Sequence, residues 1–149
     1  MIVSRPEESR MGLRPTVMLR LTIENPVSGV TYSLQDGKST PVNPVVATDL
    51  PLSLDVPVRV GPESKLTGEF VRREGPERRF VYIAIGAQAG DEGSPWSRRA
   101  KIDVHDISVQ LLEEAVQGKV VGCRLPGRAN DDGPACGTVR PLNKWIVIK

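Results

Sequence analysis

The sequence is poor in the residues on which disulfide frameworks and histidine-rich metal sites depend. Its 149 residues include two cysteines, one histidine and only 4% aromatic side chains. Two cysteines cannot form a disulfide scaffold, and one histidine cannot build a zinc site from several histidines. No apolar run approaches the 18 residues of a membrane-spanning helix, which excludes that class of membrane protein. We therefore expect no metal, no cofactor and no membrane association.

What the sequence does contain is a balanced set of charges and many turn-forming residues. The 20 basic and 18 acidic side chains give a net charge of +2, which argues against nucleic acid as a partner. The 14 glycines and 13 prolines predict many turns and little helix. Residues 1–15 carry charges but no apolar segment, so we expect a disordered or loosely attached arm before a single domain over 16–149. That arm does not resemble an export signal, so we expect a cytoplasmic protein.

Alternation of apolar and polar side chains predicts a domain built mainly of strands. The alternation predicts a hairpin over 17–35 and a strand over 52–60, where Pro57 indicates a sheet edge or a bulge. Residues 41–51 contain three prolines and are expected to form an extended loop. Further strands are predicted over 66–73, 78–87, 99–104, 120–125, 136–140 and 144–148. The segment 80–87 is apolar on both faces, which is typical of a central, buried strand.

One segment has helical rather than strand periodicity. The spacing of its apolar residues predicts a helix over 107–117, with the stripe Ile107, Leu111, Leu112, Ala115 and Val116 facing the core. Asp106 or Ser108 can cap its start, and Gly118 stands where a terminating glycine belongs. The expected fold is an antiparallel β-sandwich or partly closed barrel, with this helix packed on one end or face.

The strongest candidate for a binding site is the glycine-rich loop over 86–93 and the basic segment after it. Small residues there can present backbone N–H groups, and an aromatic ring and three cations follow at once. These residues predict a site for a small anionic ligand; the alternative is a plain hairpin loop with a solvated basic edge. The candidate ligand-binding residues are Gln88, Ser94, Trp96, Arg98, Arg99 and Lys101. Arg98 is the leading candidate, because the alternation places it on the same face as the apolar Ala100 and Ile102.

An enzyme is the alternative class of function. His105 is the only imidazole, so any mechanism that uses histidine as a base must use this residue. Its position beside Asp106, between a strand and a helix, is also one where residues cap helices. Cys136 or Cys123 could instead serve as a nucleophile, although Cys123 lies on a predicted core strand.

Three groups of residues together resemble a family of small, uncharacterised bacterial proteins. They are the runs over 19–26 and 29–32, the run over 94–102, and the run over 132–136 with Trp145. The resemblance implies a bacterial protein with one domain and assigns no role to any residue. From the residues themselves we expect a binding or interaction domain, for a small anionic ligand or a protein partner, with its oligomeric state open.

Overall fold

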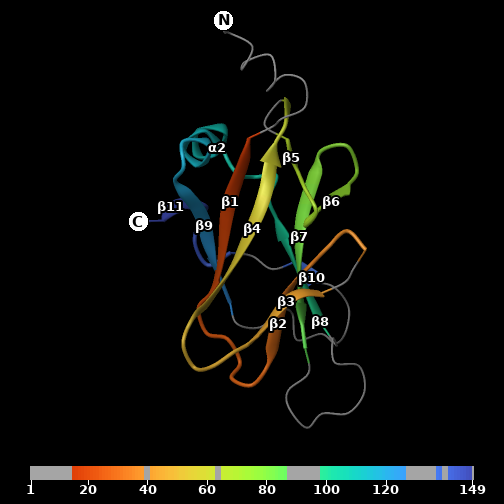
Figure 1. The fold of residues 1–149 in the computed structure, drawn as a ribbon, viewed down its shortest axis with the longest axis vertical. Coiled ribbons are helices and arrows are strands. Elements are labelled where there is room, and N and C mark those ends of the chain that lie inside the picture. Colours follow the sequence, from red (N-terminus) through yellow and green to blue (C-terminus); the bar gives the residue numbers. More distant parts are fainter. Residues whose placement is uncertain are drawn as a thin grey trace, which may run out of the picture.

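The computed structural model describes residues 15–38, 41–62, 65–86, 98–126, 137–138 and 141–148, with backbone alone at 98–99 and 137–138. The described chain is built mainly of strands, which confirms the predicted fold class. In chain order the elements are β1 (Thr16–Ile23), β2 (Thr31–Gln35), β3 (Pro41–Val46), β4 (Leu52–Val60), β5 (Leu66–Thr67), β6 (Val71–Glu74), β7 (Arg78–Ile85), β8 (Arg98–Asp103), α2 (Val109–Val116), β9 (Val120–Leu125), β10 (Gly137–Thr138) and β11 (Ile146–Ile148). Figure 1 shows their arrangement.

The first sheet contains five strands in the order β11-β9-β1-β4-β5. Its longest pairing joins β1 and β4, whose alternating apolar residues are buried on one face, while the Arg20 guanidinium and Asp55 carboxylate pair on the other. Among the described residues, β4 pairs with β1 alone over 52–58, so Pro57 does lie at a sheet edge. Position 122 of β9 requires glycine because the backbone of β1 lies close to it: an added Cβ would lie 2.2 Å from the carbonyl oxygen of Arg20.

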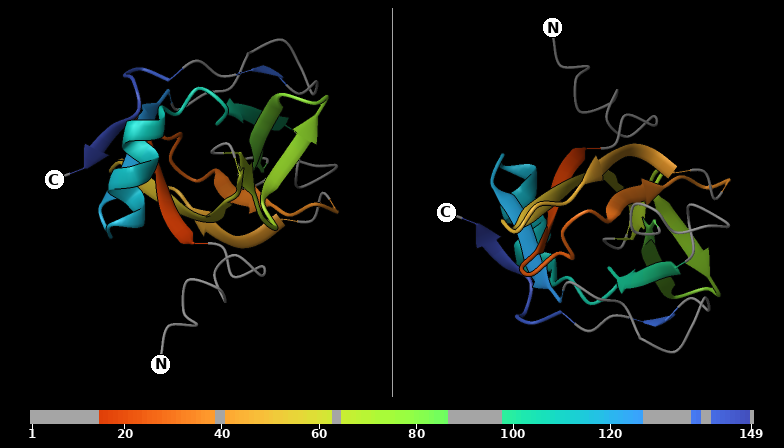
Figure 2. Two further views of the ribbon diagram at one scale, coloured as in Figure 1. Left: turned by 90° about the horizontal axis from the view of Figure 1, so that it is seen from above. Right: turned by 90° about the horizontal axis from the view of Figure 1, so that it is seen from below.

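The second sheet contains six strands and is organised around β7. The order is β10-β8-β7-β2-β3, and β6 also pairs with β7. β7 has partners on both sides, and six of its eight residues are buried: the run Phe80–Ala84, as its apolar sequence predicts, and also the charged Arg79. The two sheets curl around one interior (Figure 2), and buried residues of both belong to a single core cluster. Burial of such a continuous apolar surface is the main stabilising contribution.

Three sequence expectations about pairing are corrected by the structure. Residues 17–35 do not form a hairpin, because β1 lies in the first sheet and β2 in the second. Residues 41–46 form β3 rather than loop; β3 ends its sheet, and such an edge position tolerates proline. Two pairs, β1 with β9 and β8 with β10, are parallel in an otherwise antiparallel fold. Periodicity predicts which residues form strands, but it does not predict which strands pair with each other.

The predicted helix is present as α2, which packs at one end of the first sheet against β9, β1 and β11 (Figure 1). Ser108 caps it by accepting the backbone N–H of Leu111 at 3.2 Å, and Gly118 follows it with a φ of 99°. Leu112 and Ala115 are buried, whereas Leu111 is half-buried. Val116 is 47% exposed, so the expectation that it faces the core was wrong.

Candidate functional site

A groove of about 720 Å³ lies between the segment that leads into α2 and the segment that leads into β11. The walls include both apolar and polar side chains. The lining residues are Asp103, Asp106, Ser108, Leu111, Pro141, Leu142, Asn143, Lys144 and Trp145. A concave, partly apolar surface with a few polar groups is the usual form of a small-molecule site.

The first wall is shaped by local hydrogen bonds between β8 and α2. Asp103 ends β8, and its Oδ1 accepts the backbone N–H of His105 at 3.0 Å, which closes a tight turn. Ser108 then caps the helix, and Leu111 in its first turn also lines the groove. Aspartate and serine both favour such turns and caps, so the local sequence favours this turn and the start of this helix.

The second wall is held by β9. Leu142 donates its backbone N–H to the carbonyl oxygen of Arg124 at 2.7 Å, and the backbone N–H of Arg124 is donated to Asn143 Oδ1. Trp145 is 9% exposed and belongs to the core cluster. The wall is therefore held by the backbone of Leu142, by Asn143 and by Trp145, while Leu142 itself stays 55% exposed.

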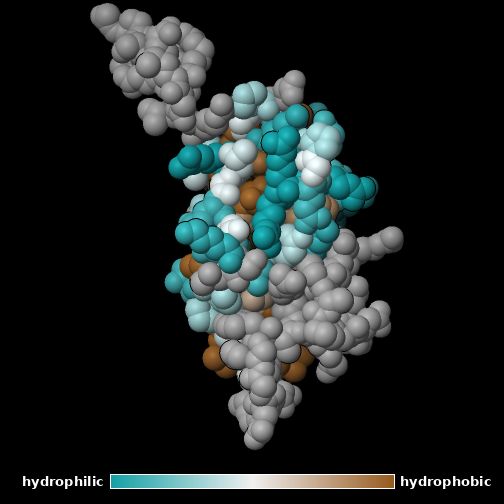
Figure 3. Space-filling model, turned by 90° about the vertical axis from the view of Figure 1, so that its right-hand side faces the viewer, coloured by the Kyte–Doolittle hydropathy of each residue, from teal (hydrophilic) through white to brown (hydrophobic). Residues whose placement is uncertain are grey.

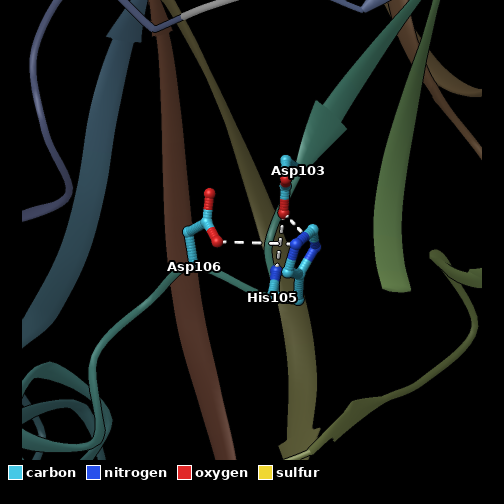
Figure 4. A group of neighbouring side chains, drawn as sticks. All are labelled: Asp103, His105 and Asp106. Carbon is cyan, nitrogen blue, oxygen red and sulfur yellow. Dashed lines mark hydrogen bonds and ion pairs between the residues drawn. The ribbon is translucent and has the colours of Figure 1, made fainter. Parts of the chain in front are cut away.

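His105 lies between two carboxylates at the edge of this groove (Figure 4). Its Nδ1 is in close contact with Asp103 Oδ1, and its Nε2 is 3.4 Å from Asp106 Oδ1. The ring also meets Phe80 edge to face, with centroids 6.0 Å apart. The His105 side chain is 26% exposed and that of Asp106 72%, so a molecule in solution can reach both.

The hydrogen-bond chemistry of this cluster is unbalanced when the imidazole is neutral. A neutral imidazole carries one N–H. If that N–H is donated to Asp103, the closer carboxylate, the lone pair on Nε2 faces the oxygen of Asp106. Two acceptors then face each other, and a proton or a metal cation between them would balance the arrangement.

A second polar cluster, around Glu74, has a donor for each acceptor. Lys101 Nζ lies 2.6 Å from Glu74 Oε1, and the Tyr82 hydroxyl donates to Glu74 Oε2. Arg72 stands 5.0 Å from the centre of the Tyr82 ring. The hydrogen bonds from Lys101 and then Tyr82 lower the pKa of the Glu74 carboxyl below its usual value. Figure 3 views the side of the molecule on which β6 lies, where hydrophilic side chains gather over the described surface.

The predicted anion site lies largely outside the described residues. Gln88, Ser94 and Trp96 are all outside them, and Arg98 and Arg99 are placed by backbone alone, opposite Ile85 and Ala84 of β7. Lys101 is described, and Glu74 already holds its ammonium group. The prediction that Ala100, Ile102 and Val104 face the core is confirmed, since all three are buried.

Of the two cysteines, Cys123 lies within the described residues. Cys123 lies on β9, is 2% exposed and is a free thiol. Burial raises its pKa to about 12, which leaves almost no thiolate at neutral pH and favours a core role. Cys136 is outside the described residues.

Sequence reasoning found His105 and its neighbour Asp106 but missed Asp103 and the second wall of the groove. The acid-x-His-acid spacing over 103–106 was a usable signal, because all three residues fall within one turn. The contribution of residues 141–145 had no local signal, since it depends on pairing with β9.

Comparison with known proteins gave one result. A family model described as a family of unknown function, DUF5990, matches residues 17–148. The searches of curated proteins and of solved structures found no match. In the part of the chain that the structure describes, no helix is both long and apolar enough to cross a membrane.

Proposed function

We propose that this chain, which belongs to the DUF5990 family of unknown function, is a binding domain that takes a small molecule in the groove beside His105. The observation that carries the proposal is the groove itself, about 720 Å³ in volume and walled by Leu111 of α2, the segment before that helix and residues 141–145. This volume lies within the range of small-molecule sites. A bacterial, cytoplasmic setting is part of the proposal, and the free thiol of Cys123 is compatible with it.

The walls favour a ligand with an apolar body and a polar end. Apolar surface is provided by Leu111, Leu142 and Trp145, and more than half of the surface of Leu142 is exposed to water. Covering it with a ligand would remove that surface from water, which contributes about 25 cal/mol per Å². Asp103 and Asp106 on one side and Lys144 on the other can orient polar groups of the ligand.

The proposal is tested by a fragment screen with ligand-observed NMR, followed by affinity measurements on matched variants. The fluorescence of Trp145 can report binding in a Trp96→Phe background, since the chain has two tryptophans. Leu142→Asp places a charge on the apolar wall and should weaken the hits at least tenfold. The control is Leu50→Asp, which alters a leucine that is 68% exposed and does not line the groove. Equal affinity in both variants, or a screen without hits, would contradict the proposal.

A second candidate function, an enzyme in which His105 exchanges protons with the ligand, is supported by the close Asp103–His105 contact at the groove edge. A carboxylate that accepts one ring N–H orients the imidazole and leaves the other nitrogen to act as a base. Here the groove ligands would be chemically converted by the wild type and left unchanged by His105→Ala, as followed by mass spectrometry. Binding without conversion in both proteins favours the binding domain.

The anion site predicted at 86–101 stays a separate proposal. Its one described side chain, Lys101, is shared with Glu74, so the described residues support it less than they support the groove. Stabilisation of the wild type by an anion, lost in Arg98→Ala but kept in Leu142→Asp, would place the ligand there.

A further inference from the structure

We propose that His105 and Asp106 bind a divalent transition-metal ion, with Asp103 as a positioning residue, and that the ion presents open coordination positions to the groove. This goes against the expectation from the sequence, where a single histidine argued for no metal. The ion site stands on the geometry of the three side chains; the statement about its groove ligand rests also on the proposed function.

The distance between the two metal-binding atoms fits a shared ion. His105 Nε2 and Asp106 Oδ1 are 3.4 Å apart. Zinc binds nitrogen and carboxylate oxygen at about 2.0–2.1 Å, and two ligands at tetrahedral angles are then about 3.3–3.4 Å apart. The separation of the two atoms is therefore the one that a shared zinc ion requires.

Asp103 is placed to hold the ring nitrogen of His105 that does not bind the metal. A metal-binding histidine commonly donates its other ring N–H to a carboxylate, which fixes the tautomer and the ring orientation. Asp103 contacts Nδ1 with the same oxygen that holds the backbone N–H of His105. The ring is steadied further by its edge-to-face contact with Phe80. One donor atom from each of Asp103, His105 and Asp106 lies within 4.8 Å of the others.

The donor set selects the class of metal. Imidazole nitrogen suits zinc, copper, nickel and iron, whereas magnesium and calcium prefer sites built from oxygen alone. Two direct ligands leave positions for water or for a bound molecule. Because the groove borders the cluster through Asp103 and Asp106, its ligand would be a small anion with a metal-coordinating oxygen, such as a carboxylate, on an apolar body.

The ion site is tested on the full chain, freed of any histidine tag and carrying Cys136→Ser to remove a competing thiol. Isothermal titration calorimetry with zinc and the visible spectrum of added cobalt measure binding directly. We expect one ion per chain. Binding should fall at least tenfold in His105→Ala and in Asp106→Asn, and by about 10–100-fold in Asp103→Asn. The matched control is Asp49→Asn, an exposed aspartate outside the cluster, which should bind as the wild type does.

Two results would overturn the proposal. One is the absence of zinc and cobalt binding up to millimolar concentration; the other is binding that His105→Ala leaves unchanged. Nitrogen NMR of the His105 ring adds a second readout, since metal binding at this site shifts the Nε2 signal, whereas zinc bound elsewhere on the chain would leave that signal unchanged.

Failures of the two proposals can be told apart. If metal binds and Leu142→Asp changes the affinity of no groove ligand, the ion site stands and the proposed function fails. If groove ligands bind equally with and without zinc, the proposed function stands and the coupling of the ion to the ligand fails.

Discussion

The Glu74 cluster and the His105 cluster lie close together and share Phe80, yet they are built differently. Lys101 Nζ, which belongs to the Glu74 cluster, stands 4.2 Å from the centre of the Phe80 ring, and the His105 ring meets the same side chain edge to face. In the Glu74 cluster, Lys101 and Tyr82 donate to both oxygens of one carboxylate. In the His105 cluster, one imidazole meets two carboxylates.

This difference separates a structural network from a candidate binding site. A network whose donors match its acceptors needs nothing further, and removing a member leaves a partner unsatisfied. In the His105 cluster a neutral imidazole has one N–H for two carboxylates, so one acceptor pair is left without a donor and can bind a cation. The comparison therefore predicts large effects on folding in the packed core, smaller ones in the Glu74 cluster, and least in the His105 cluster.

The largest effect is expected in the apolar core that anchors α2. Leu112 of α2 is 3% exposed and belongs to the core cluster. Leu112→Ala should lower the free energy of unfolding by about 2–5 kcal/mol, because it removes buried apolar contacts and leaves a cavity. This loss of stability is measured by urea denaturation, monitored by circular dichroism. A loss below about 0.5 kcal/mol would mean that α2 is not anchored by this face.

The fold could be predicted further than the site, for a physical reason. The alternation in β1 and β4, the apolar run in β7 and the helical spacing in α2 are local properties, and they predict the strands and the helix. The pairing of β1 with β4 and β9, instead of with β2, depends on contacts between distant residues that periodicity does not encode. The groove depends on such a contact too, since Leu142 is held by Arg124.

An intermediate effect is expected in the Glu74 cluster. Glu74→Gln removes the charge that Lys101 faces and should cost about 1 kcal/mol, a figure kept small because the Glu74 side chain is 38% exposed. The matched control is Glu77→Gln at the hairpin tip, where the side chain is 77% exposed and the contact to Lys65 is 3.9 Å long. Equal stability of the two variants in urea denaturation would remove the distinction between the clusters.

The same carboxylate predicts a dependence on pH. The pKa of Glu74 is lowered in the folded protein by its bonds to Lys101 and Tyr82, so its contribution to stability is present above its unfolded pKa. That contribution is lost as the pH falls through the lowered folded pKa. The difference in unfolding free energy between wild type and Glu74→Gln should therefore shrink on acidification from pH 7. A difference that stays constant down to pH 2 would show that the charge does not produce it.

The smallest effect on folding is expected for Asp106→Asn, and it is the sharpest test of the comparison. Asp106 is 72% exposed and its oxygen is 3.4 Å from Nε2, so replacing the charge should change the free energy of unfolding by less than about 0.5 kcal/mol.

A doubly protonated His105 would make Asp106 one of two ion-pair partners, and the variant would then lose stability. A neutral ring would make the two acceptors repel, and the variant would be as stable as the wild type or slightly more so, because an amide N–H can be donated to Nε2. Thermal unfolding of both proteins in a metal chelator, and again with zinc, separates these cases. A wild type that zinc stabilises, beside an Asp106→Asn variant that it does not, is the outcome that the unbalanced cluster predicts.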